Sequence, residues 1–377
     1  MRHVALSVCI VLVVVVQVSA RTWYIKADGS GDAATIQAGI DSSATGDTVL
    51  VGAGTYTGLG NRAIDFKGRD VLLVSEFGPQ VTVIDCDGAA NALRFVSGET
   101  AATVIQGITV MDGYSSGNGG AVLCLNSSPT MINCVIASST SGHYGGGIYC
   151  NTSALTLIDC TFSGDSASLD GGGLCCSWSS PTITDCNFIN NASGNHAAGL
   201  FCTNYSSPAI TGCLFLDNSA PFGGGAIGCN YYSSPVIADC TMCGNSGGTG
   251  GALEAVDFSE PTLVNSIIVF NTTGCAVSCS MGQVEIQCCD IHGNAGGDWV
   301  GCISGQYGAD GNFSADPLFC DLPGVDLAVQ GCSPCLPGYH PDGYDCGGTI
   351  GAFGSGCGCD NAVQPSTWGG IKTQFKE

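Results

Sequence analysis

Residues 171–191 read GGGLCCSWSSPTITDCNFINN, and variants of this segment recur along the chain every 26 or 27 residues. The recurring features are glycines, a first cysteine, a Ser-Ser-Pro turn, a second cysteine and an asparagine five residues later. Alignment of the repeats gives two columns, which are Cys124, Cys150, Cys176, Cys202, Cys229 and Ala255, and Cys134, Cys160, Cys186, Cys213, Cys240 and Ser266. A fixed period of this length is typical of a solenoid whose repeats stack on one another.

Within each repeat, apolar residues alternate with polar ones in short runs that are separated by turn residues. Alternation with a period of two predicts three strands per repeat, not helices. One such repeat cannot bury its apolar face alone, but stacking at ~4.8 Å per coil buries it. The sequence therefore predicts an all-β, single-stranded parallel β-helix. The side chains expected to point inward in two successive coils are Leu174, Cys176, Ile183, Cys186, Phe188, Leu200, Cys202, Ile210, Cys213 and Phe215.

The cysteines of the two columns are predicted to be mostly free thiols that fill the core. Stacked Cβ atoms lie ~4.8 Å apart, which is longer than the ~3.8 Å mean of a disulfide. A linear stack also does not form a tetrahedral metal site. The repeated asparagine is expected to adopt a left-handed bend, and stacked asparagines are expected to bond to one another. They are Asn191, Asn218, Asn245 and Asn271.

After Thr272 the period decays, and the cysteines there lie in sequence rich in Gly, Pro and Asp. This context predicts several disulfides, but the sequence does not determine how the cysteines pair. They are Cys288, Cys289, Cys302, Cys320, Cys332, Cys335, Cys346, Cys357 and Cys359.

The chain is predicted to have five parts. Residues 1–20 have the apolar run and the small residues before Ala20 of a cleaved signal peptide, so we expect a secreted or cell-surface bacterial protein. No apolar run is long enough to predict a transmembrane segment. The other parts are an N-terminal cap over residues 21–70 with a helix near residues 34–43, coils over 71–275, a C-terminal cap over 276–360 and a flexible tail over 361–377. The tail is either an export or anchoring signal or a disordered end.

The chain resembles known families at three places. Residues 35–41 (TIQAGID), 46–49 (GDTV) and 54–56 (GTY) resemble the N-terminal cap of pectin-lyase-like right-handed parallel β-helix proteins. The coils are similar to the repeats of polymorphic outer-membrane proteins, which pair a Gly-Gly-Ala-Ile type motif with Phe-x-x-Asn. Here the first motif is GGGAI at 223–227 and GGAL at 250–253, and the second is FINN at 188–191 and FLDN at 215–218. DPLFC at 316–320, SPC at 333–335 and IGAFG at 350–354 look like the closing segment of bacterial repeat proteins of this class. The resemblance implies a right-handed helix but no single function, because this scaffold carries lyases, hydrolases, esterases and adhesins.

Charge narrows the possible functions. The formal net charge is −22, and no Lys or Arg occurs between residues 95 and 371. Such a surface repels phosphate backbones and anionic lipids, so binding of nucleic acid or of a membrane surface is disfavoured. Cations, Ca²⁺ among them, would be attracted. The missing Lys and Arg also argue against a polyuronate lyase, which needs a cationic base and a clamp for carboxylates.

Two stacked columns supply candidate site residues. Asp159 and Asp185 precede the second cysteine and would lie ~5 Å apart, close enough to bridge Ca²⁺ or to act as a catalytic pair. The alternative is that they are turn residues, since Asn and Gly share their column. Exposed aromatic residues after the first cysteine could stack on sugar rings, meet a partner surface or pack against the Ser-Ser-Pro corner. They are Trp178, Tyr205, Tyr231 and Tyr232.

A third column, two residues before the glycines, holds Tyr144, Asp170, His196 and Phe222. Because these residue types are unrelated, we interpret the column as a solvated loop, with His143 beside it. We predict no catalytic residues and no cofactor beyond Ca²⁺. The predicted function is therefore a non-enzymatic, surface or secreted module that binds polysaccharide or cell-surface glycan in adhesion. The alternatives are a pectin-lyase-like carbohydrate-active enzyme, with a hydrolase favoured over a lyase, or a purely structural surface protein.

Overall fold

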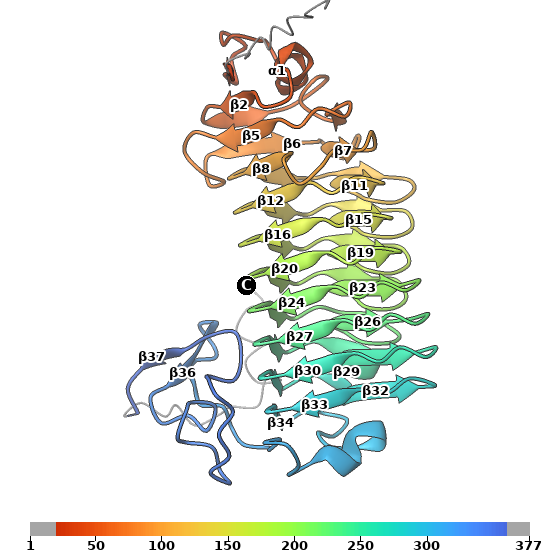
Figure 1. Cartoon of the computed structure of the whole chain (residues 1–377), viewed down its shortest axis with the longest axis vertical. Helices are drawn as coiled ribbons and strands as arrows, with labels where there is room; N and C mark the ends of the chain where they lie inside the picture. Colours follow the sequence, from red (N-terminus) through yellow and green to blue (C-terminus); the bar gives the residue numbers. More distant parts are fainter. Residues whose placement is uncertain (1–19, 360–377) are drawn as a thin grey trace, which may run out of the picture.

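The computed structural model describes residues 20–359, which form a long solenoid of parallel strands (Figure 1). Three parallel sheets, here called A, B and C, run along the solenoid and enclose its core. Sheet A has 11 strands: β1 (Thr22–Ile25), β2 (Thr48–Val51), β5 (Leu72–Ser75), β8 (Val104–Gln106), β12 (Thr130–Ile132), β16 (Thr156–Ile158), β20 (Thr182–Thr184), β24 (Ala209–Thr211), β27 (Val236–Ala238), β30 (Thr262–Val264) and β33 (Glu285–Gln287).

Sheets B and C have 10 and 9 strands. Sheet B consists of β3 (Gly54–Tyr56), β6 (Thr82–Asp85), β9 (Thr109–Met111), β13 (Val135–Ala137), β17 (Thr161–Ser163), β21 (Asn187–Ile189), β25 (Leu214–Leu216), β28 (Thr241–Cys243), β31 (Ile267–Val269) and β34 (Asp290–His292). Sheet C consists of β4 (Ile64–Asp65), β7 (Leu93–Phe95), β11 (Val122–Leu125), β15 (Ile148–Asn151), β19 (Leu174–Ser177), β23 (Leu200–Thr203), β26 (Ile227–Cys229), β29 (Ser246–Val256) and β32 (Thr273–Ser280).

The predicted stacking is confirmed. Cys124, Cys150, Cys176, Cys202 and Cys229 pair in register in sheet C, and Ala255 follows Cys229. All the side chains predicted to point inward are fully buried. The rings of Phe162, Phe188 and Phe215 stack at 4.6 and 4.8 Å between centroids. A small ribbon of short strands, β10 (Tyr114–Ser115), β14 (Thr140–Ser141), β18 (Ser166–Ala167) and β22 (Ala192–Ser193), continues the register at one corner.

The second cysteine column has a polar role that we did not predict. The backbone N–H of Cys160 donates to Sγ of Cys186, and the same bond repeats from Cys186 to Cys213 and from Cys213 to Cys240. Ser266 takes the next place, where its Oγ accepts from the N–H of Cys240. These thiols therefore satisfy backbone donors at a corner in addition to filling the core, which explains why serine is accepted in the column.

The repeated asparagines form a buried ladder, as predicted. The Oδ1 atoms of Asn218, Asn245, Asn271 and Asn294 each accept bonds from the backbone N–H and from Nδ2 of the preceding member. The expected left-handed bend lies elsewhere, however. Positive φ occurs one residue before the ladder, for example 54° at Asn190. The ladder asparagines themselves do not have positive φ.

Asp165 occupies the ladder position above Asn191, where it is fully buried. Its Oδ1 accepts from the N–H of Ser139, while its Oδ2 has no hydrogen-bond partner among the described residues. Burial raises the pKa of this carboxyl well above its usual range. The protonated, neutral form of Asp165 is thus favoured. Even this form has no Nδ2 group, which in the ladder asparagines donates hydrogen bonds to neighbouring coils.

Asp165→Asn is therefore expected to stabilise the protein by about 1–3 kcal/mol. The new Nδ2 would donate to the carbonyl of Ile136, as Nδ2 of Asn191 donates to Phe162, which pairs with Ile136 in register. The gain should grow as pH rises, since only the wild-type side chain can ionise there. Denaturant unfolding of wild type and variant at pH 5 and pH 8 measures this gain in the free energy of unfolding. The reverse change, Asn191→Asp, should destabilise, and a destabilised Asp165→Asn variant would refute this account.

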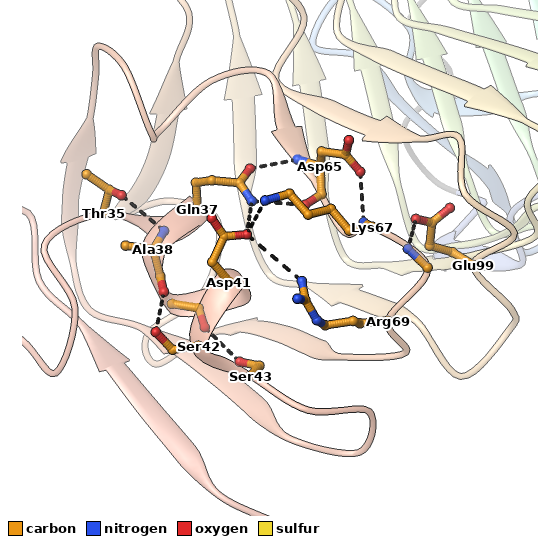
Figure 2. A network of polar contacts seen from close by, with 12 residues as sticks. Thr35, Gln37, Ala38, Asp41, Ser42, Ser43, Asp65, Lys67, Arg69 and Glu99 are labelled. Atoms are coloured by element: carbon orange, nitrogen blue, oxygen red, sulfur yellow. Dashed lines mark hydrogen bonds and ion pairs between the residues drawn. The ribbon is translucent and has the colours of Figure 1, made fainter.

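The N-terminal helix covers the first coil. Helix α1 (Ile36–Ser42) is shorter than the predicted 34–43, with Thr35 as its N-cap, and buries Ile36 and Ile40 on the main core. Its exposed side is tied to the next coil, where Gln37 bonds to the backbone of Asp65 and Asp41 meets Lys67 and Arg69 (Figure 2). This end of the solenoid is thereby closed against edge pairing.

The sheets extend beyond residues 71–275 at both ends, because β1 and β2 precede this interval and β33 and β34 follow it. The segment after β34 has two parts. The 3₁₀ helix η1 (Gly301–Gln306) buries Ile303 against the last coils. The rest folds back along the outer face of sheet B as a small sheet of β35 (Phe319–Asp321), β36 (Asp326–Gln330) and β37 (Ser355–Cys357) (Figure 1).

Three disulfides confirm the prediction for the C-terminal region. Cys288 pairs with Cys346, Cys320 with Cys357, and Cys302 with Cys279, which was not among the cysteines expected to pair. The members of the two columns are free and buried. The predicted signal peptide and tail lie outside residues 20–359, apart from Ala20 at the edge. Within the described residues, no helix is long and apolar enough to cross a bilayer.

Candidate functional site

The outer face of sheet C carries an irregular column of side chains. The column consists of the equivalent outward positions in successive strands, which are Tyr149, Cys175, Phe201, Gly228 and Glu254. Small residues therefore alternate with large ones, and hollows form where the small residues lie. Cys175 and Phe201 are nevertheless buried, because residues from the adjoining turns pack over them.

A cavity of about 250 Å³ opens on this face. Aromatic rings form much of its wall, and those of Tyr144 and Tyr149 stack at 6.4 Å between centroids. Polar groups from the ends of the strands complete it. The lining residues are Tyr144, Tyr149, Asp170, Cys175, Ser177, Phe201, Thr203, Asn204, Asn230 and Tyr231. A concave surface that combines aromatic rings with fixed polar groups can hold a small polar ligand.

Asp170 is the charged member of this lining. Its side chain is only 6% exposed, and Oδ1 accepts a 2.7 Å bond from the backbone N–H of His196. Burial raises the pKa of this carboxyl, although that bond and the nearby imidazole oppose the rise. Burial and the charge of Asp170 likewise raise the pKa of Tyr144. The cavity thus holds a carboxyl group whose negative charge is poorly solvated.

Beside the cavity, the half-buried His196 pairs with the buried Glu254, at 3.2 Å between Nδ1 and Oε2. The hydrogen bond to Glu254 raises the pKa of His196 above its ordinary value, against the effect of burial. Thr249 donates to the other oxygen of Glu254. Gly223 makes the pair possible, because a Cβ at this position would collide with both partners.

The predicted aromatic residues separate into two groups. All four are exposed, but only Tyr231 lines the cavity. The other three, Trp178, Tyr205 and Tyr232, form a continuous stack with Phe258, with successive ring centroids 5.2 Å apart. The sequence pattern did not single out Phe258. Both ring faces of Tyr205 and Tyr232 are covered by neighbours in the stack. A sugar ring needs a free aromatic face, so the interior of this stack cannot offer one.

Asp159 and Asp185 lie at the turn between sheets A and B. Both have positive φ, as do Asn133, Asp239 and Asn265 in the same column, and both carboxylates are exposed. Left-handed backbone explains why Asp, Asn and Gly alternate here. Across residues 20–359 no group of three or more His, Cys, Asp or Glu side chains is arranged to hold a metal ion. The Ca²⁺ bridge remains a prediction.

The interpretation of the third column as a solvated loop was partly wrong. His143 and Phe222 are exposed, but Asp170 is buried and His196 is half-buried against Glu254. The missed signal was the outward column of sheet C, in which Tyr149, Cys175 and Phe201 are apolar although an outward strand position is usually polar. Three such residues in successive coils indicate that something packs over them.

A protein-family model supports the architecture. Residues 146–314 match a family model described as a right-handed beta helix region, which confirms the predicted fold class. No curated protein sequence matches the chain. A solved pectate lyase, Pel9A, is similar at 13% identity and a TM-score of 0.49, covering 90% of this chain and 98% of its own. A pectin methylesterase from carrot is similar at 14% identity and a TM-score of 0.43, covering 78% and 88%.

Proposed function

We propose that this protein is a secreted or cell-surface, non-enzymatic β-helix that binds glycans in adhesion. The observation that carries the proposal is the cavity on sheet C, where Tyr149, Phe201 and Tyr231 surround hydrogen-bonding groups. Sugars present apolar C–H faces that stack on aromatic rings and hydroxyls that bond to amide and hydroxyl groups. Asn204 and Asn230 supply such amides at the rim.

Secretion is supported by two independent features. The apolar run before Ala20 has the form of a cleaved signal peptide. The three disulfides of the C-terminal region would persist only in an oxidising compartment. A glycan on a cell wall or on another cell is the polymer that such a protein would meet there.

Tyr231→Ala is expected to weaken glycan binding about threefold to tenfold, because it removes one exposed aromatic wall of the cavity. Binding to a broad glycan array, followed by calorimetry on the strongest ligand, measures the change. Trp178→Ala is the matched control, since it removes an equally exposed ring that lies in the stack outside the cavity. Equal losses in the two variants would contradict the assignment of the site. No binding to any glycan would favour a purely structural surface protein.

A second candidate is a polysaccharide hydrolase, and Asp170 is the observation that favours it. A carboxyl with a raised pKa that lines a cavity is suited to act as a general acid, and glycosidases need one such group and a second carboxylate. Glu254 is a buried carboxylate that pairs with His196 beside the cavity and is the candidate for this second role. Release of reducing sugar that Asp170→Asn abolishes would establish this function in place of the non-enzymatic one.

A further inference from the structure

The part of the chain that forms the cavity has imidazole groups but no Lys or Arg. All Lys and Arg side chains of the described residues lie between residues 21 and 94, where Lys67 and Arg69 are engaged with Asp41 (Figure 2). The coils that form the cavity contribute none. Electrostatic attraction in a low-dielectric cleft lined by one sign of charge selects ligands of the opposite sign.

Inside the cavity, Asp170 has no Lys or Arg partner anywhere in the described part of the chain. The nearby imidazole of His196 directs Nδ1 to Glu254, and the hydrogen bond from His196 to Asp170 comes from its backbone N–H. The imidazole of His196 offsets only part of the cost of burying this carboxylate, and a cationic ligand group would relieve more of it.

The aromatic rings around Asp170 reinforce this preference. Tyr144, Tyr149, Phe201 and Tyr231 line the same cavity, and the face of an aromatic ring attracts a positively charged nitrogen. Rings that surround one carboxylate form the arrangement that recognises ammonium groups. A uronate would instead bring a second negative charge next to Asp170, with no Lys or Arg to neutralise it.

We propose that this cavity recognises a glycan that carries a positively charged nitrogen, either the free ammonium group of an amino sugar or an alkylammonium substituent. The inference rests on the proposed glycan-binding function and specifies its ligand class. Asp170 provides the charge-assisted hydrogen bond, and the tyrosine rings provide the cation–π contacts. Neutral sugars bind more weakly at the same walls, and uronates are excluded.

The test compares oligosaccharides of equal length by calorimetry, at a pH at which the sugar amine is protonated. The probes are a glucosamine oligomer, its N-acetylated counterpart, a galacturonic acid oligomer and free choline. The glucosamine oligomer is expected to bind about tenfold tighter than the acetylated one. The galacturonic acid oligomer should not bind, and choline should bind if an alkylammonium group is sufficient.

Asp170→Asn should reduce the preference for the free amine to less than about threefold while it retains binding of the acetylated oligomer. Asp185→Asn removes an exposed carboxylate away from the cavity and is the control for general attraction to the acidic surface. Equal loss of preference in both variants, or equal affinity of wild type for both oligomers, overturns the inference and leaves glycan binding intact. Binding of choline without any glycan refutes the glycan function but not the cation site. No binding of any probe refutes both.

Discussion

Asn218→Ala is expected to lower the free energy of unfolding by about 3–6 kcal/mol, because it interrupts the asparagine ladder at its centre. Asn218 Nδ2 donates to the carbonyl of Phe188 at 2.8 Å and to Oδ1 of Asn245 at 3.0 Å. Its Oδ1 accepts from the backbone N–H and from Nδ2 of Asn191 at 3.1 and 2.9 Å. Truncation removes the side-chain partner of the Asn191 backbone N–H, and it takes one partner each from the Phe188 carbonyl, from Nδ2 of Asn191 and from Oδ1 of Asn245. A buried group that is left unpaired costs about 1–3 kcal/mol, and the weakened bonds add to that loss.

Denaturant unfolding followed by far-ultraviolet circular dichroism measures this loss. Asn187→Ala is the control from the same coil, since Asn187 is half-exposed and its side chain makes no hydrogen bond in the structure. The control should change stability by no more than about 0.5 kcal/mol. If both variants lost the same stability, the ladder would contribute no more than an ordinary surface asparagine.

Asp290→Asn is expected to stabilise the protein in a strongly pH-dependent manner. Asp290 lies in β34 and is fully buried, where Oδ1 accepts from the N–H of Ala315 and Oδ2 lies 3.5 Å from Sγ of Cys335. Burial raises the pKa of this carboxyl to about 8. The folded chain thus holds the proton more tightly than the unfolded chain, in which the pKa is about 3.9.

The direction of the effect follows from this difference. Below pH ~4 both states are protonated and Asp290 imposes no penalty. As pH rises from about 4 to about 8, the unfolded chain ionises freely while the folded chain resists, so wild-type stability falls, and above this range it levels off. The asparagine variant does not ionise, so its advantage grows over the same window and reaches the order of 5 kcal/mol.

Unfolding measured at pH 4, 6 and 8 for both proteins tests this. Asp310→Asn, at an exposed site in the same region, should leave the pH dependence unchanged. Parallel stability curves for wild type and Asp290→Asn would show that Asp290 is solvated or paired in the folded protein. Because Asp290 bridges the last coil of sheet B to the C-terminal segment, loosening at high pH is expected to begin there.

Much of this solenoid could be predicted from its repeat. A period of 26 or 27 residues places each residue over its equivalent in the next coil. The stacking of Cys176 on Cys202 and of Phe188 on Phe215 therefore follows from spacing alone. The asparagine ladder follows for the same reason. The left-handed bend was misplaced by one residue, because spacing shows which residues stack but not which of two neighbours turns the chain.

The sequence by itself determined the parallel β-helix, its core columns and the disulfide-bearing C-terminal region. Only the tertiary structure decided which outward side chains meet. Tyr231 lines the cavity while its neighbour Tyr232 joins the stack, and His196 reaches Glu254 across 58 residues of chain. Such contacts do not repeat from coil to coil. They need a residue without a side chain in one coil, such as Gly223, and a long side chain in another. A repeat specifies what every coil shares, whereas the candidate site consists of the positions at which the coils differ.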